Sequence, residues 1–169
     1  IYVNTYGDSI DASDVKRTWN EDTREETTEG TISIKNANLQ ELKVYKTWVK
    51  GSNANITYKL YRTISTDPAV VDWEQARGAG TPSEIDPSET VYNWTPDSNW
   101  EEVDTTVEFT ANLFATSETG DRKDKSVPGL PKADADGHPY TYRVWEDADA
   151  SRYEANQISN TEVVNTNLH

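Results

Sequence analysis

The stretch Leu42-Lys43-Val44-Tyr45-Lys46-Thr47-Trp48 has the alternation of a β-strand with one buried face. Alternate side chains of a strand share a face, so Lys46 is predicted to point the same way as Val44 and Trp48. Lys43 falls on the opposite face and is the weaker candidate for any role inside the protein. A lysine in the apolar phase either extends its amine to solvent or has a partner in the core.

Two later segments show the same irregularity. Tyr142-Arg143-Val144-Trp145-Glu146 places a glutamate in its apolar phase, and Val163-Val164-Asn165-Thr166 places an asparagine there. Burying a lysine, a glutamate and an asparagine in one core is costly unless they act on each other. These residue types could form an amide cross-link between Lys46 and Asn165, with Glu146 as the proton shuttle. The simpler alternative is that Glu146 is an edge carboxylate and Asn165 a ladder residue.

Composition narrows the classes of partner. The chain has 169 residues, a net charge of −14, and neither cysteine nor methionine. The negative charge argues against nucleic acid and against an anionic membrane surface. We find no membrane-spanning stretch and no signal peptide, and the start at Ile1 suggests a piece excised from a longer protein.

The order of strand signals predicts an all-β sandwich. Expected strands include 42–49, 56–63, 107–115, 139–146 and 161–166, with a charged loop at 117–125 and one helical turn at 72–76. We predict two parts, residues 1–39 as the end of a preceding domain or an N-terminal extension, and residues 40–169 as the sandwich. Within the first part, 8–30 is polar and is expected to be a long loop or partly disordered, and 31–36 is expected to be a strand.

Residues 64–104 are predicted to form a long insertion with few regular elements. They contain three of the six tryptophans, and the candidate ligand-binding residues are Trp73, Trp94, Trp100 and Tyr92. Exposed aromatic rings could stack on a carbohydrate or contact a host protein. The alternative is that they form a small satellite core.

Other catalytic and metal sites are poorly supported. Asp134 and Asp136 lack the spacing of an EF-hand, and His138 has no histidine or cysteine partner for a metal. There is no nucleophile elbow and no phosphate-binding glycine loop. We therefore expect no metal, no cofactor and no turnover enzyme.

Three motifs resemble CnaB-type domains, the immunoglobulin-like modules of Gram-positive pilins and adhesins. They are Lys46-Thr47-Trp48 followed by Ile56-Thr57-Tyr58-Lys59-Leu60-Tyr61, then Gly129-Leu130-Pro131-Lys132 running on to Glu146, and finally Val163-Val164-Asn165-Thr166-Asn167. The resemblance spans residues 42–167. The chain departs from the family in the insertion and at residues 123–128, where an aromatic strand is usual.

The resemblance implies an immunoglobulin-like sandwich with an intramolecular isopeptide bond, joining Lys46 to Asn165 beside Glu146. It also implies a stalk, pilin or adhesin module on a Gram-positive cell surface, anchored to the cell wall by segments outside this chain. Expected partners are neighbouring domains of the same protein or pilus, with a host glycan or matrix protein as a further partner. Asn36 would be the cross-link residue of a second, preceding module.

Overall fold

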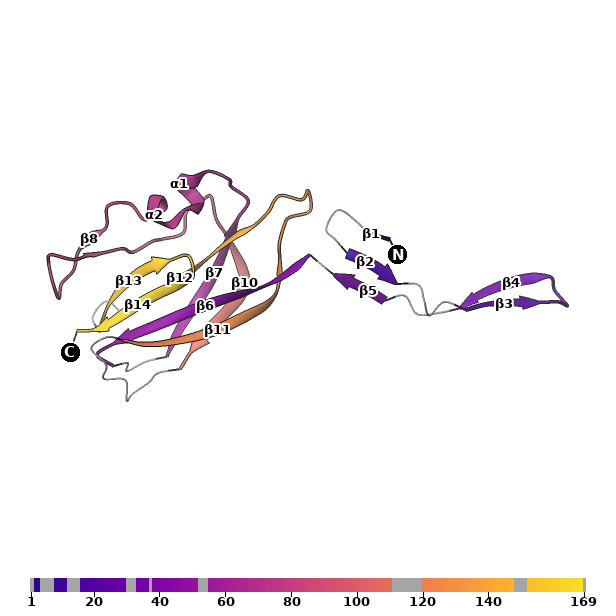
Figure 1. Ribbon diagram of the computed structural model, residues 1–169, viewed down its shortest axis with the longest axis horizontal. Coiled ribbons are helices and arrows are strands. Elements are labelled where there is room, and N and C mark those ends of the chain that lie inside the picture. Colours follow the sequence, from indigo (N-terminus) through magenta and orange to yellow (C-terminus); the bar gives the residue numbers. More distant parts are fainter. Residues whose placement is uncertain are drawn as a thin grey trace. The chain divides into compact units, whose positions relative to one another are not determined.

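Most of the regular secondary structure in the described residues is β-strand, as the sequence predicts (Figure 1). The structure, a computed structural model, describes residues 2–3, 8–11, 16–29, 33–36, 38–51, 55–110, 120–147 and 152–168. The chain divides into two units, residues 1–40 with 129–139, and residues 41–128 with 140–169. The domain boundary expected at residues 39/40 stays a prediction.

Two sheets form the larger unit. The first is antiparallel, with β7 (Ile56–Thr63) between β10 (Glu101–Phe109) and β12 (Thr141–Glu146). The second has the order β11-β6-β14-β13. Its strands are β6 (Leu39–Val49), β11 (Asp121–Pro131), β13 (Tyr153–Ser159) and β14 (Glu162–Asn167). Strand β14 runs parallel to β6 and antiparallel to β13.

The core lies between these two sheets and contains aromatic contacts from both. The Phe109 ring of the first sheet packs edge-on against Trp48 of the second, with ring centres 6.4 Å apart, and against Tyr58 at 5.4 Å. Val44, Leu60 and Val144 are fully buried. From Ile56 to Tyr61, each buried side chain of β7 alternates with a more exposed one, which is the pattern of a strand covered on one face. The sheets therefore form a sandwich.

The insertion expected at 64–104 covers residues 64–100, between β7 and β10, because β10 begins at Glu101. It holds two short helices, α1 (Pro68–Val71) and α2 (Trp73–Ala76), and a small hairpin of β8 (Thr81–Pro82) and β9 (Thr90–Val91). Each helix begins at an aspartate whose carboxylate accepts a backbone N–H of the first turn, Asp67 in α1 and Asp72 in α2. The helical turn expected at 72–76 is confirmed, and α1 is an addition to it.

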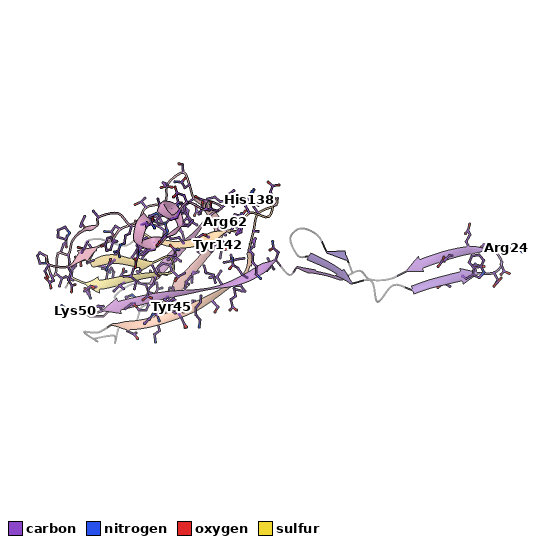
Figure 2. All side chains as sticks on the ribbon, turned by 45° about the horizontal axis from the view of Figure 1, so that its top comes forward. Arg24, Tyr45, Lys50, Arg62, His138 and Tyr142 are labelled. Atoms are coloured by element: carbon purple, nitrogen blue, oxygen red, sulfur yellow. The ribbon has the colours of Figure 1, made fainter. Side chains whose placement is uncertain are left out.

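The polar N-terminal stretch is not the long loop that we expected. It contains β2 (Asp8–Asp11) and a hairpin of β3 (Lys16–Asn20) and β4 (Glu25–Glu29). Strand β2 lies between β1 (Tyr2–Val3) and β5 (Ser33–Asn36). The hairpin turn contains Arg24 at φ 54°, which Figure 2 labels at the tip. The sequence of its two strands is polar apart from Trp19, so it lacks the hydrophobic alternation by which a strand is recognised.

Three further expectations need correction. The charged segment at 117–125 is strand from Asp121 onward, because β11 lies beside β6 in the sheet and its charged side chains face solvent. The strand expected at 107–115 begins earlier, at Glu101, and β10 ends at Phe109. Strand β13 was not predicted at all. Residues 111–119 lie outside the described residues.

No helix in the described part of the chain is both long and apolar enough to cross a membrane.

Leu60 and Leu39 form a matched pair for testing the core. Leu60 is fully buried, whereas Leu39 is 39% exposed. We expect Leu60→Ala to lower the free energy of unfolding by about 2–5 kcal/mol, because it leaves a cavity between the sheets. Leu39→Ala should change it by less than about 0.5 kcal/mol. Urea denaturation measures both, and equal losses would contradict this placement of the core.

Candidate functional site

The two sheets bring Lys46, Glu146 and Asn165 together inside the sandwich. Lys46 and Asn165 lie on the neighbouring strands β6 and β14, where Val163 pairs with Lys46 and Asn165 pairs with Trp48. Both side chains point inward because each strand presents its apolar face to the core. Glu146 comes from β12 in the facing sheet. The acid therefore reaches the other two residues across the core.

The Glu146 carboxylate bonds both of the other side chains. Lys46 Nζ donates to Oε2 at 2.9 Å, and Asn165 Nδ2 donates to Oε1 at 2.6 Å. Lys46 Nζ also donates to the carbonyl oxygen of Val163 at 3.1 Å. One carboxylate thus holds an amine and a carboxamide side by side, and the cross-link between them stays a prediction.

Almost no solvent reaches this trio. Lys46 and Asn165 have no exposed surface, and the Glu146 side chain is 2% exposed. Burial lowers the pKa of Lys46 from 10.5 to about 8, although Glu146 and then Glu162 act in the opposite direction. The amine is therefore much closer to its neutral, nucleophilic form than a surface lysine is.

The side-chain oxygen of Asn165 is buried. Its Oδ1 is without a hydrogen-bond partner among the described residues. Rotation of the amide by half a turn would bring Oδ1 toward Glu146, where only a protonated carboxyl could donate to it. A protonated Glu146 and a neutral Lys46 together carry the same single proton as the ion pair.

The competing lysine lies elsewhere. The Lys43 side chain is 56% exposed, and its amine pairs with Asp124 at 3.3 Å. It lies on the opposite face of β6 from Lys46, as predicted. Asn36 ends strand β5, and the surroundings of its side chain lie outside what the structure describes, so its role in a second module stays a prediction.

The tryptophans of the insertion surround an arginine of the sandwich. Arg143 of β12 is fully buried, and its Cζ lies 5.2 Å from the ring centre of Trp73, 4.8 Å from Trp94 and 4.3 Å from Trp100. Its Nε donates to Asn160 Oδ1 at 2.6 Å. Burial lowers the pKa of Arg143 to about 10. Sequence reasoning missed this residue, because nothing near it in the chain shows that tryptophans cover it.

The candidate ligand-binding residues differ in how deeply this packing buries them. Trp73 and Trp100 are buried, while Trp94 and Tyr92 are half-buried. The Tyr92 ring is covered by Arg77, whose Cζ lies 4.3 Å from its centre. An open cavity of about 360 Å³ is lined by Trp94 and Trp145, among other residues. A ligand in this cavity would meet Trp94, but neither Trp73 nor Trp100.

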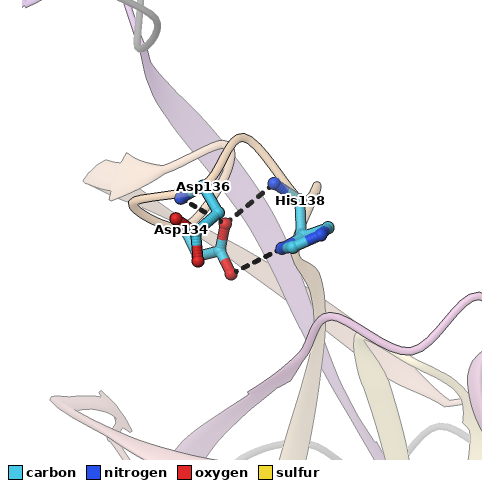
Figure 3. Close-up of side chains that lie close together, drawn as sticks. All are labelled: Asp134, Asp136 and His138. Atoms are coloured by element: carbon cyan, nitrogen blue, oxygen red, sulfur yellow. Dashed lines mark hydrogen bonds and ion pairs between the residues drawn. The ribbon is translucent and has the colours of Figure 1, made fainter.

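The acidic turn after β11 is held by its own hydrogen bonds. The turn brings together the side chains of Asp134, Asp136 and His138 (Figure 3). One oxygen or ring nitrogen from each lies within 4.8 Å of those of the other two. The Asp134 carboxylate accepts the backbone N–H groups of Asp136 at 3.0 Å and His138 at 2.8 Å, and contacts the His138 ring at 3.0 Å. The cluster is therefore a turn in which the Asp134 side chain accepts backbone N–H groups of the following residues.

Comparisons with models of protein families, with curated proteins and with solved structures found no match to this chain.

The pKa of Lys46 predicts how stability depends on pH before any cross-link forms. Asn165→Ala removes the acceptor and keeps the lysine. Folding lowers the pKa of Lys46, so the unfolded chain binds more protons between about pH 8 and pH 10.5. Stability should therefore rise with pH across this window, by roughly 3 kcal/mol in total.

Urea denaturation of Asn165→Ala against the double variant Lys46→Met/Asn165→Ala isolates this effect, because pH effects from groups that do not contact Lys46 cancel in the difference. A difference in unfolding free energy that stays constant across the window would contradict the lowered pKa of Lys46.

Proposed function

We propose that this chain is a structural module of a bacterial surface protein, a stalk, pilin or adhesin segment, stabilised by an amide bond that forms between Lys46 and Asn165. The observation that carries the proposal is the shared carboxylate of Glu146, which bonds the amine at 2.9 Å and the carboxamide at 2.6 Å in a buried site. The resemblance to CnaB-type domains supports the same assignment.

The reaction balances without any cofactor. In the neutral arrangement of the pair, Lys46 Nζ attacks the side-chain carbonyl carbon of Asn165, while the protonated Glu146 donates to the carbonyl oxygen. A nitrogen–carbon bond forms and the carbon–nitrogen bond of the carboxamide breaks. Glu146 carries a proton from the lysine nitrogen to the departing nitrogen, which leaves as ammonia. The reaction happens once in each molecule.

The fold supplies proximity for this step. Three strands from two sheets hold the reacting groups in one water-poor site, and such positioning can replace about 7–11 kcal/mol of a barrier. In the unfolded chain, 100 residues separate Lys46 from Glu146. The reaction therefore depends on folding and needs no other enzyme.

The product would join β6, near the start of the sandwich sequence, to β14, near its end. These two strands are parallel neighbours in one sheet. Lys46 is on β6 and Asn165 on β14, so a pulling force on the chain would pass through the covalent bond and leave the strands between them unloaded. The bond would also restrict the unfolded chain. By analogy with disulfides, closing a loop of this length stabilises by about 4–5 kcal/mol.

A surface location fits the composition. An acidic chain with no cysteine and no methionine lacks the disulfides that small exported domains commonly use. A Lys–Asn amide is another covalent cross-link that such a domain can use. Neighbouring domains of the same protein or pilus are the partners that we propose.

Intact-protein mass tests the cross-link directly. We expect the wild-type chain to be lighter than its sequence mass by one ammonia, and Lys46→Ala or Glu146→Ala to have the full mass. Lys43→Ala is the matched control, because it removes a lysine of the same strand on the exposed face, and it should still lose ammonia. A wild-type chain of unmodified mass would refute the proposal.

The cavity beside Trp94 supports a second candidate function, the binding of a carbohydrate or host protein by the insertion. If it binds a glycan, a glycan array should give a signal that Trp94→Ala abolishes. Trp73→Ala, at a buried ring away from the cavity, should keep the signal wherever the variant folds. A signal that survives Trp94→Ala would exclude this cavity as the binding site.

A further inference from the structure

A buried tyrosine connects the strands that carry the three reactive residues. Tyr58 of β7 has no exposed surface. Its hydroxyl donates to the carbonyl oxygen of Tyr45 on β6 at 2.6 Å and accepts the backbone N–H of Val163 on β14 at 3.0 Å. Tyr58 lies in the sheet facing β6 and β14, so the hydroxyl reaches across the core to join their backbones.

The joined positions are next to the reacting groups. Tyr45 immediately precedes Lys46, and Val163 is the residue opposite Lys46 in the β6–β14 ladder. The carbonyl of Val163 also accepts the Lys46 amine at 3.1 Å. A shift of β14 along β6 would therefore break the bond from the Val163 N–H to the Tyr58 hydroxyl and move Asn165 relative to the amine.

Tyr58 is also connected to the acid. Within its own sheet, it is the residue paired with Glu146 in the β7–β12 ladder. Tyr58 thus connects the backbones of β6 and β14, through its hydroxyl, to strand β7, which pairs with the strand that carries Glu146.

From these contacts we propose that Tyr58 is a positioning residue for the cross-link, whose hydroxyl holds Lys46 and Asn165 in register against Glu146. This inference rests on the proposed function. The hydroxyl bonds backbone atoms, so it acts through the strands and does not touch the reacting atoms. Burial raises the pKa of Tyr58, which keeps the hydroxyl protonated and able to donate.

Tyr58→Phe removes the hydroxyl and leaves the ring. Protein made by a pulse of cell-free translation can be followed by intact mass, so that the rate of ammonia loss is measured from the time of synthesis. We expect the rate to fall by roughly 10- to 100-fold, because a small displacement of reacting groups has an effect of that size. Circular dichroism and a thermal melt check that the variant is folded during the measurement.

The matched control is Tyr61→Phe. It removes a hydroxyl from the same strand, on the outward face where Tyr61 packs edge-on against Trp94 and Trp145, and it should react at the wild-type rate. A folded Tyr58→Phe that also reacts at the wild-type rate would overturn the positioning role. If the wild-type chain itself never loses ammonia, the proposed function has failed instead.

A second arm does not depend on the folding of Tyr58→Phe. Fluorinated tyrosines at position 58 keep the hydroxyl and nearly the same shape, but make the phenol more acidic. Positioning predicts the wild-type rate and an unchanged pH profile for each of them. A rate or a pH profile that follows the acidity of the phenol would show that Tyr58 transfers a proton, and would overturn the inference.

Discussion

The ion pair of Lys46 and Glu146 is the constraint on which the organisation of the sandwich depends. Removing either charge from water costs several kcal/mol, and the attraction of the pair offsets that cost only with good geometry and further hydrogen bonds. The structure provides these bonds through Asn165 and through the carbonyl of Val163. Strands β6, β12 and β14 must therefore keep a fixed register. Displacement of β6 or β12 would separate the two buried charges, and displacement of β14 would remove the hydrogen bonds that accompany them.

The same unit buries a second cation by different means. None of the hydrogen-bond partners of Arg143 in the described chain is a carboxylate. Its guanidinium contacts aromatic faces and donates to oxygen atoms of Asn160 and Val70. Three tryptophans of the insertion provide those faces. The insertion and the sheet are consequently linked through this arginine, and the tryptophans serve first as its packing partners.

Tyr58 shows how these constraints meet at the reactive site. Its ring belongs to the aromatic core with Phe109, and its hydroxyl joins the strands that carry the lysine and the asparagine. Packing and positioning are therefore properties of the same residue. A substitution that kept only its volume would keep the core and lose the connection between the strands.

Sequence alone determined the all-β class, the inward direction of Lys46, Glu146 and Asn165, and the outward direction of Lys43, because side-chain alternation in a strand is a local property of the chain. It could not identify the polar hairpin β3–β4 or strand β11, whose pairing leaves no hydrophobic alternation to detect. Only the tertiary structure decided that one carboxylate holds both reactive groups, that tryptophans enclose Arg143, and that Tyr58 links β6 to β14. These contacts join residues far apart in the chain, and the register between strands and sheets, which a single strand does not encode, sets their geometry.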